Sequence, residues 1–290
     1  MFTLRQLEFA VAVAEEGSFT AAASRCHTVQ SGLSHQIARL EDAFGTRLFE
    51  RSHRRVRPTA AGEVFLHNAR LTLQAAARLQ EEMALTLGTV RGRINIGQIT
   101  SLNVVDVPAL LAAFRAAHPA VEVHLKAGMS DLLLAEVEAG NLDVALVGVG
   151  PQITLPPQHR LLHEEGLSLV MPTDHPLASL TAIPLQALQG LPLAALVPGA
   201  GVRRMLDDAL RERGVQAQLQ YEVTHSELQQ QLVAAGLAVA VVPDSMAARM
   251  QRTLVRPLVE PFRFRTCAVW RADPTPAARA LLDLLPAGPA

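Results

Sequence analysis

The chain has 290 residues, of which 49% are hydrophobic and 18% are charged, and its formal net charge at pH 7 is −1. This length favours two or three domains, and the hydrophobic content excludes wholesale disorder. Because the chain as a whole is not a polycation, any surface that binds nucleic acid must be local.

The cysteines and the apolar segments limit the class of protein further. Cys26 and Cys267 are the two cysteines, and neither belongs to a CxxC or metal-ligand spacing. The N-terminus lacks the basic and apolar regions of a signal peptide, and no apolar window is long enough to span a membrane. We therefore expect a soluble, cytoplasmic protein that uses no metal and no cofactor.

The first 58 residues predict three helices followed by a short hairpin. Helices are expected from Leu4 to Glu16, after an N-cap at Ser18, and from an N-cap at Thr28 to Gly45. On the third helix one apolar stripe recurs at helical spacing and comprises Val29, Leu33, Ile37, Leu40 and Phe44. Residues 48–51 and 55–57 are then expected to form the two strands of a wing.

Residues 18 to 40 contain no acidic side chain, as a helix that enters the major groove requires. The face opposite the apolar stripe carries small or hydrogen-bonding groups, and we expect base contacts from Gln30, Ser31, Ser34 and His35. Residues 47–57 hold five arginines against one acid, and Arg51, Arg54 and Arg55 are expected to contact phosphate or a narrow minor groove. A solvated basic loop is the alternative for the arginine cluster, but its place directly after the acid-free helices favours DNA.

From Thr59 to Leu87 the sequence predicts one long helix between domains. Small or apolar residues recur there at spacings of four and three, at Phe65, Ala69, Thr72, Ala76, Leu79, Met83 and Thr86. Such a stripe needs a partner, and a second copy of the chain is the simplest one; packing on its own domain is the alternative. A homodimer would read an inverted repeat in double-stranded DNA.

Beyond a linker at residues 88–93, strands and helices alternate. This pattern predicts α/β structure with a mostly parallel sheet covered on both faces. Strands are expected at 94–97, 121–125, 142–147, 167–171, 193–197, 218–223, 238–242 and 264–270, and helices at 104–117, 130–139, 202–213, 227–235 and 274–285. The economical arrangement is two lobes with a cleft between them. Lobe I would take about 91–161 and 268–290, and lobe II about 162–267.

Loops that follow strand ends are the usual ligand sites of α/β sheets. Thr100 and Ser101 follow the first strand, Ser130 opens the next helix, and Arg203 and His225 lie at the starts of two later helices. Helix N-termini with hydroxyl groups suit a carboxylate or another small anion, so we predict an anionic metabolite as ligand. For each hydroxyl alone, a plain N-cap is the alternative.

Several motifs match a known family over nearly the whole chain. They are Leu4-Arg5-Gln6-Leu7, Gly17-Ser18-Phe19-Thr20-Ala21-Ala22-Ala23, Gln30-Ser31-Gly32-Leu33-Ser34, Leu48-Phe49-Glu50-Arg51, Gly140-Asn141-Leu142-Asp143 and Val242-Pro243. In these motifs the chain resembles a LysR-type transcriptional regulator. His35 and Cys26 depart from the pattern, because a basic residue and a leucine are usual there.

The resemblance implies a fold and a function. It implies an N-terminal winged helix-turn-helix (residues 1–58), a linker helix that pairs two subunits (59–87), and a C-terminal effector-binding domain (88–290) like a periplasmic binding protein. It also implies a small-molecule effector in the cleft and often a tetramer, with RNA polymerase as a further candidate partner. The expected function is thus sequence-specific regulation of transcription controlled by an effector.

Other classes of protein remain as alternatives. A cytosolic α/β ligand-binding protein, or an enzyme, could carry an incidental basic N-terminal domain; yet the sequence has no GxGxxG, GxxxxGK[ST], HExxH or GxSxG motif, and we expect no catalysis. A secreted solute-binding protein would need a signal peptide. A redox sensor of the same family would need reactive cysteines, whereas Cys267 lies in an apolar strand.

Overall fold

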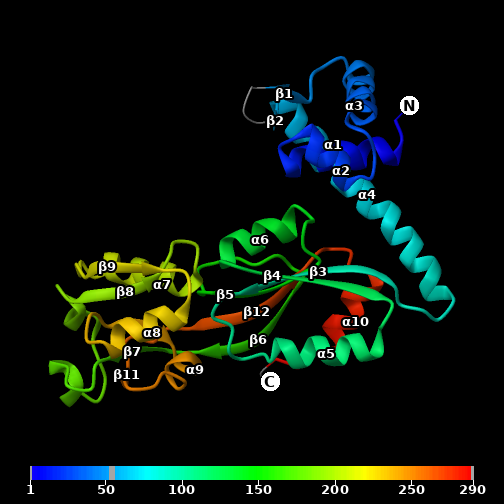
Figure 1. The fold of residues 1–290 in the computed structure, drawn as a ribbon. Coiled ribbons are helices and arrows are strands. Elements are labelled where there is room, and N and C mark those ends of the chain that lie inside the picture. The colour runs from blue at the N-terminus through cyan, green and yellow to red at the C-terminus, as the bar shows by residue number, and fades with distance from the viewer. Residues whose placement is uncertain (1, 52–55, 289–290) are drawn as a thin grey trace. The chain divides into compact units, whose positions relative to one another are not determined.

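The computed structural model describes residues 2–51 and 56–288, with the side chain of residue 51 left out. The chain divides into two compact units, Met1–Thr89 and Val90–Ala290, drawn in Figure 1. Within the described ranges no helix is both long enough and apolar enough to cross a bilayer.

The N-terminal unit consists of three helices, a two-stranded wing and a long helix. Its elements are α1 (Leu4–Glu16), α2 (Phe19–Arg25), α3 (Gln30–Phe44), β1 (Phe49–Arg51), β2 (Val56–Pro58) and α4 (Ala60–Thr86). β1 and β2 pair antiparallel, as a wing requires. Ser18 caps α2 by accepting the N–H of Ala21, and Gly45 ends α3 in the left-handed conformation. The predicted helix-turn-helix and wing are both present.

The start of α3 differs from the prediction. The N-cap is Val29 and not Thr28, and no side chain caps this end of the helix. Leu33 and Ile37 of the predicted stripe are fully buried, but Val29 is 68% exposed and Phe44 is 48% exposed. Val29 precedes the first helical turn, and Phe44 is the last helical residue; both therefore lie beyond the turns of α3 that face the core.

Helix α4 packs on the helix-turn-helix core through its N-terminal part. Leu66 joins the core of the helix-turn-helix, and Gly62 lies against the wing. A Cβ atom at Gly62 would lie 2.0 Å from the carbonyl oxygen of Leu48, so only glycine allows this approach. Farther along, Leu79 is 64% exposed and Met83 is 59% exposed. The predicted stripe is therefore covered by its own unit in part and is otherwise exposed.

Lobe I of the C-terminal unit is a five-stranded mixed sheet with the order β4-β3-β5-β12-β6. Its elements are β3 (Gly92–Ile99), α5 (Val107–Ala117), β4 (Val121–Gly128), α6 (Ser130–Glu138), β5 (Val144–Val149), β6 (His159–Glu165), β12 (Phe264–Trp270) and α10 (Pro276–Leu284). One hydrophobic cluster joins the sheet to α5 and α10, and another joins the opposite face to α6 (Figure 1). The sheet is therefore covered on both faces.

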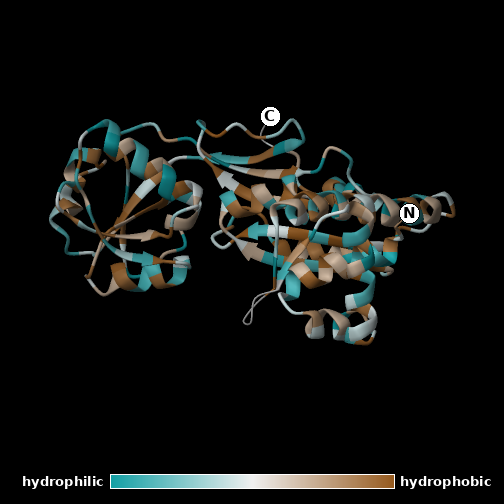
Figure 2. Cartoon of the chain, turned by 90° about the horizontal axis from the view of Figure 1, so that it is seen from above, coloured by the Kyte–Doolittle hydropathy of each residue, from teal (hydrophilic) through white to brown (hydrophobic). Residues whose placement is uncertain are grey.

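Lobe II is formed by the residues between β6, the last strand of lobe I before the chain leaves it, and β12, the strand with which the chain returns. Its elements are β7 (Leu167–Met171), the 3-10 turns η1 (Pro176–Ser179) and η2 (Leu185–Leu188), β8 (Pro192–Leu196), α7 (Gly201–Glu212), β9 (Gln218–Val223), α8 (Ser226–Ala234), β10 (Ala240–Pro243), α9 (Asp244–Ala247) and β11 (Leu254–Pro257). The strands form a β10-β7-β11 sheet and a β8-β9 pair, linked by a bridge between Leu193 and Val239. In Figure 2 hydrophobic residues run through the interior of the lobes.

The expectation of mostly parallel sheets is wrong. β3 pairs parallel with β4 and β5, and β8 with β9, but β12 runs antiparallel to β5 and β6, and β7 runs antiparallel to β10 and β11. In lobe I the physical reason is that β12 brings the chain back from lobe II and enters the sheet in the opposite direction. β6 and β12 belong to that sheet over their whole length, so they extend past the predicted lobe limits near 161 and 268.

Candidate DNA-binding surface and effector cleft

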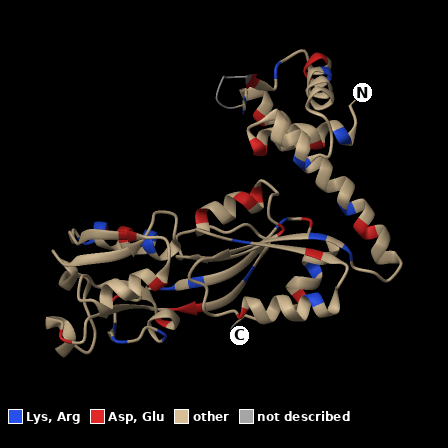
Figure 3. Ribbon diagram, in the orientation of Figure 1, with Lys and Arg blue, Asp and Glu red and all other residues tan. Residues whose placement is uncertain are grey.

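The polar face of α3 is accessible in the N-terminal unit. Gln30, Ser31 and His35 are exposed, and Ser34 is half-buried beside them. The first acid along the chain after Glu16 is Glu41, and Figure 3 shows α3 without charged residues except toward one end. The face that would approach bases therefore carries hydrogen-bonding groups without a carboxylate near its first turns.

Two side-chain contacts fix the position of α3. Nε2 of Gln6 on α1 donates to Oε1 of Gln36 on α3 at 3.0 Å. At the other end, Oε1 of Glu41 accepts the backbone N–H groups of Leu48 and Phe49 at 2.8 and 3.2 Å. Because these contacts tie α3 both to α1 and to the first strand of the wing, its exposed face is presented by a rigid frame.

The turn between α2 and α3 contains a left-handed residue. His27 has φ 51° and is exposed. Such a backbone conformation is unfavourable for a residue with a Cβ atom. Only four residues separate the end of α2 at Arg25 from the start of α3 at Gln30. The tight turn sets the angle between the two helices.

The predicted wing contacts lie mostly outside the described residues. Arg54 and Arg55 belong to residues 52–55, and for Arg51 the structure gives only the backbone, in β1. Sequence reasoning left out Arg39, which is exposed four residues after His35 and eight after Ser31. That spacing puts Arg39 on the same helical face, and an i, i+4, i+8 count would have found it.

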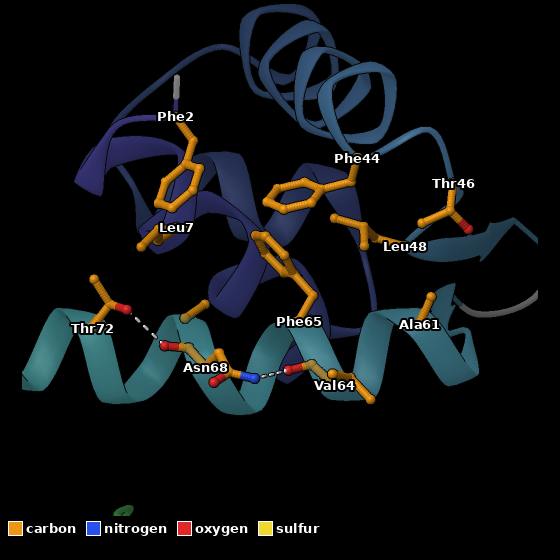
Figure 4. Close-up of a pocket in the computed structure, with 11 residues that line it drawn as sticks. Phe2, Leu7, Phe44, Thr46, Leu48, Ala61, Val64, Phe65, Asn68 and Thr72 are labelled. Carbon is orange, nitrogen blue, oxygen red and sulfur yellow. Dashed lines mark hydrogen bonds between the residues drawn. The ribbon is translucent and has the colours of Figure 1, made fainter.

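An apolar groove of about 340 Å³ lies between the helix-turn-helix and α4 (Figure 4). The rings of Phe2, Phe44 and Phe65 meet in it, with centroids 5.8 Å apart for Phe2 and Phe44 and 5.3 Å apart for Phe44 and Phe65. Val64 lines it from α4 and is exposed. Apolar side chains gathered at an exposed hollow are a common feature of protein interaction surfaces.

The cleft between the lobes is nearly filled. Its lining comes from both lobes: Ile99, Thr100, Ser101, Met129, Ser130, Gly148, Leu196, Ala200, Gly201, Val202 and Phe264. The remaining cavity measures about 10 Å³, which is room for about one water molecule. Helices α6 and α7 both begin at this cleft, and neither has a side-chain N-cap.

The structure brings together three of the five predicted effector residues. Thr100, Ser101 and Ser130 line the cleft. The Ser130 hydroxyl is already engaged, since it donates to the Gly148 carbonyl at 2.7 Å and accepts the Gly148 N–H at 3.2 Å. The Thr100 and Ser101 hydroxyls have no hydrogen-bond partner among the described residues, so they are the better placed for a ligand.

Arg203 and His225 are not among the residues that line the cleft. The Arg203 guanidinium binds Asp207 at 2.8 Å, Glu222 at 2.8 Å and the Leu196 carbonyl at 3.0 Å. His225 is exposed at the start of α8, and its Nδ1 lies 2.8 Å from the Thr224 hydroxyl. Sequence reasoning missed Asp131 and Arg204, which form an ion pair beside the cleft lining.

Both units match family models. Residues 4–63 match the bacterial regulatory helix-turn-helix protein, lysR family, and residues 87–289 match the LysR substrate binding domain. The chain belongs to the LysR family of bacterial transcriptional regulators. A LysR-family protein of this kind is a DNA-binding regulator of transcription with an effector-binding domain, not an enzyme.

Individual LysR-family members agree over most of the chain. A hydrogen peroxide-inducible genes activator of Escherichia coli O6:H1 is 30% identical over 244 residues, which cover 83% of this chain and 78% of the relative. The structure of a full-length OxyR variant from Pseudomonas aeruginosa has a TM-score of 0.74 and 27% identity, covering 98% of this chain and 95% of that one. Full-length CbnR in complex with its target DNA has a TM-score of 0.64 and 25% identity, covering 98% and 99%.

The cysteines of this LysR-family chain bear on redox sensing. Cys267 is buried in β12, and burial raises the pKa of its thiol, although the charge of Arg265 partly opposes this. A raised pKa lowers the thiolate fraction that reacts with oxidants. Cys26 lies at the end of α2 in the other unit. The burial of Cys267 therefore does not favour the peroxide response that the name of the E. coli relative describes.

Proposed function

We propose that this regulator reads an inverted-repeat operator through Gln30, Ser31, Ser34 and His35 of α3, with Arg51, Arg54 and Arg55 of the wing on phosphates. The observation that carries the proposal is the exposed, acid-free face of α3 in a frame fixed by Gln6 and Glu41. Gln is suited to bidentate contact with adenine, and Ser is permissive. A DNA-binding role also supports a cytoplasmic location, with RNA polymerase as a candidate partner.

Binding-site selection from a random duplex library, with the purified full chain, tests this function. On the selected duplex, Gln30→Ala should weaken binding by about 1–3 kcal/mol and relax the preference at one base. Arg54→Ala should weaken binding to all duplexes alike and lower the salt slope by about one. Gln220→Ala, an exposed glutamine in the C-terminal unit, should change neither.

Two results would count against the proposal. If no duplex were bound with salt-sensitive affinity, the operator-binding role would fail. If Arg54→Ala changed base preference and left the salt slope unchanged, the division between base contacts and phosphate contacts would be wrong.

We further propose that the cleft binds a small anionic metabolite and that residues 88–290 form the domain that responds to it. The two uncapped helix N-termini and the available Thr100 and Ser101 hydroxyls support an anion. A thermal-shift screen of metabolites should yield acids, and calorimetry should confirm them. A screen in which only neutral or cationic compounds bind would remove the anionic class.

The active form is proposed to be a homodimer joined through α4, with a tetramer as a further level of assembly. The exposed Leu79 and Met83 of α4 and the neighbouring apolar groove support a second copy as partner. The symmetry of such a dimer matches the two halves of an inverted repeat.

A further inference from the structure

Polar contacts join the two lobes across the effector cleft. The Asp131 N–H of lobe I donates to the Gly199 carbonyl of lobe II at 3.3 Å. Nη1 of Arg249 in lobe II donates to Oδ1 of Asn103 in lobe I at 3.2 Å. The carboxylate of Asp131 also pairs with the guanidinium of Arg204. The cleft is therefore held closed by contacts that must break when the lobes separate.

The two lobes also approach closely at two glycines. A Cβ atom at Gly201 would lie 1.9 Å from the carbonyl oxygen of Gly148, and one at Gly150 would lie 2.6 Å from Cγ of Met205. The cavity that the lining residues enclose measures about 10 Å³, which is room for about one water molecule. An effector of metabolite size must therefore bind as the lobes move apart, at the groups that this movement uncovers.

Arg204 is the cation that such a movement would release from an ion pair, whereas Arg249 would leave only the neutral amide oxygen of Asn103. Arg204 lies on the first turns of α7, two residues beyond the cleft residue Val202, and its partner Asp131 directly follows the cleft residue Ser130. Both side chains are partly exposed, with 43% and 41% of their surfaces accessible. Arg203 differs, because its partners Asp207 and Glu222 lie in the same lobe and stay with it.

We propose that Arg204 binds the acidic group of the effector and that Asp131 occupies Arg204 from the opposite lobe while the cleft is empty. This inference rests on the proposed effector function. It adds Arg204 as a ligand-binding residue and Asp131 as a competitor for the same guanidinium. A ligand carboxylate offers the guanidinium the same pair of oxygens as Asp131 does. When the anion binds, its acidic group replaces the Asp131 carboxylate as the partner of Arg204, and the contact between the lobes opens.

Sulfate is the probe for the exchange, titrated by calorimetry into the full chain at constant ionic strength. Asp131→Asn removes the competing charge and should tighten sulfate binding by about two- to fivefold, the range expected for a partly exposed ion pair. Arg204→Gln should abolish sulfate binding, and Arg204→Lys should leave weak binding. Asp208→Asn and Arg211→Gln break an ion pair within α7 and should behave as the wild type.

Hydrogen exchange without ligand gives a second readout. Both Asp131→Asn and Arg204→Gln should raise amide exchange at the starts of α6 and α7, because each breaks the same lobe contact. We expect the two variants to change sulfate affinity in opposite directions but to change amide exchange in the same direction. A pair that served only to hold the lobes together would not separate the two variants by sulfate affinity. Equal changes of sulfate affinity in the two variants, or no sulfate binding to Asp131→Asn, would overturn the proposal. Because no metabolite is used, this outcome is separate from that of the metabolite screen.

Discussion

Asp143 is a buried carboxyl group in lobe I. Its hydrogen bonds and the nearby cation do not fully offset the cost of burying its negative charge. It is 7% exposed, and its Oδ2 accepts the Asn95 N–H at 2.8 Å. Burial raises its pKa above the ordinary value, against the hydrogen bonds from Asn95 and the charge of Arg271 at 3.7 Å. The folded chain thus holds a proton on Asp143 more tightly than the unfolded chain does.

This raised pKa gives a pH dependence with a definite sign. Stability from Asp143 is fully present below its unfolded pKa, near 3.9, and is lost as the pH rises through the folded pKa. Asp143→Asn keeps an acceptor for the Asn95 N–H and carries no charge. We expect it to raise the melting temperature at pH 7, with the difference vanishing below about pH 3.5. A lower melting temperature at pH 7 would show that Arg271 outweighs the burial.

Single residues were predictable where local pattern decides their role. Ser130 was identified from its place at a helix start, and the pairing of Arg203 with Asp207 could have been inferred from the i, i+4 spacing. The pairing of Asp131 with Arg204 could not, because 73 residues separate them and only the approach of two lobes brings them together. The contact of Gln6 with Gln36 could not be predicted either, because it depends on how α1 packs against α3.

Elements were predicted well where apolar periodicity is strong. The first helix, at Leu4–Glu16, and the strand at Phe264–Trp270 have the predicted bounds. The strand at His159–Glu165 was missed because its sequence is mostly polar and only Leu162 is buried in it. Strand order was not predictable either. No local pattern tells that β12 enters between β5 and β6 and makes the sheet mixed.

The approach of α4 to the wing gives a prediction at the scale of elements. Gly62→Ala would place a Cβ atom 2.0 Å from the Leu48 carbonyl oxygen, and backbone cannot move aside as a side chain can. We expect a loss of about 2 kcal/mol or more in the free energy of unfolding, measured by urea titration and circular dichroism. Gly32→Ala is the control, since its Cβ in the first turn of α3 would meet nothing closer than 3.4 Å. It should be neutral or stabilise by up to about 1 kcal/mol.

At the scale of the whole molecule, the two units have separate cores. The helix-turn-helix core is drawn from residues 9–66, whereas the cores of the lobes are drawn from residues 94–285. The sequence showed this division as a change from mostly helical segments before the linker to alternating strands and helices after it. The placement of an effector cleft followed from the alternation of strands and helices, but its nearly filled state did not.

The proposed dimer can be tested on α4. Leu79→Glu should weaken self-association by about tenfold or more in sedimentation velocity, because it replaces an apolar contact with a charge. Gln80→Glu, at the adjacent exposed position, adds the same charge off the stripe and should have little effect. A wild-type chain that sediments as a monomer, or an equal effect of both substitutions, would contradict the dimer through α4.

The place of β12 in the sheet of lobe I sets an order of assembly during synthesis. Lobe II lies between Leu167 and Pro257, so all its strands have been made before Phe264–Trp270 emerges from the ribosome. Lobe I then waits with β5 and β6 unjoined until this late strand inserts between them. A nascent chain whose residue 264 has not emerged would hold a completed helix-turn-helix, a first lobe that lacks its inserted strand and a second lobe that lacks the Phe264 side chain of its core.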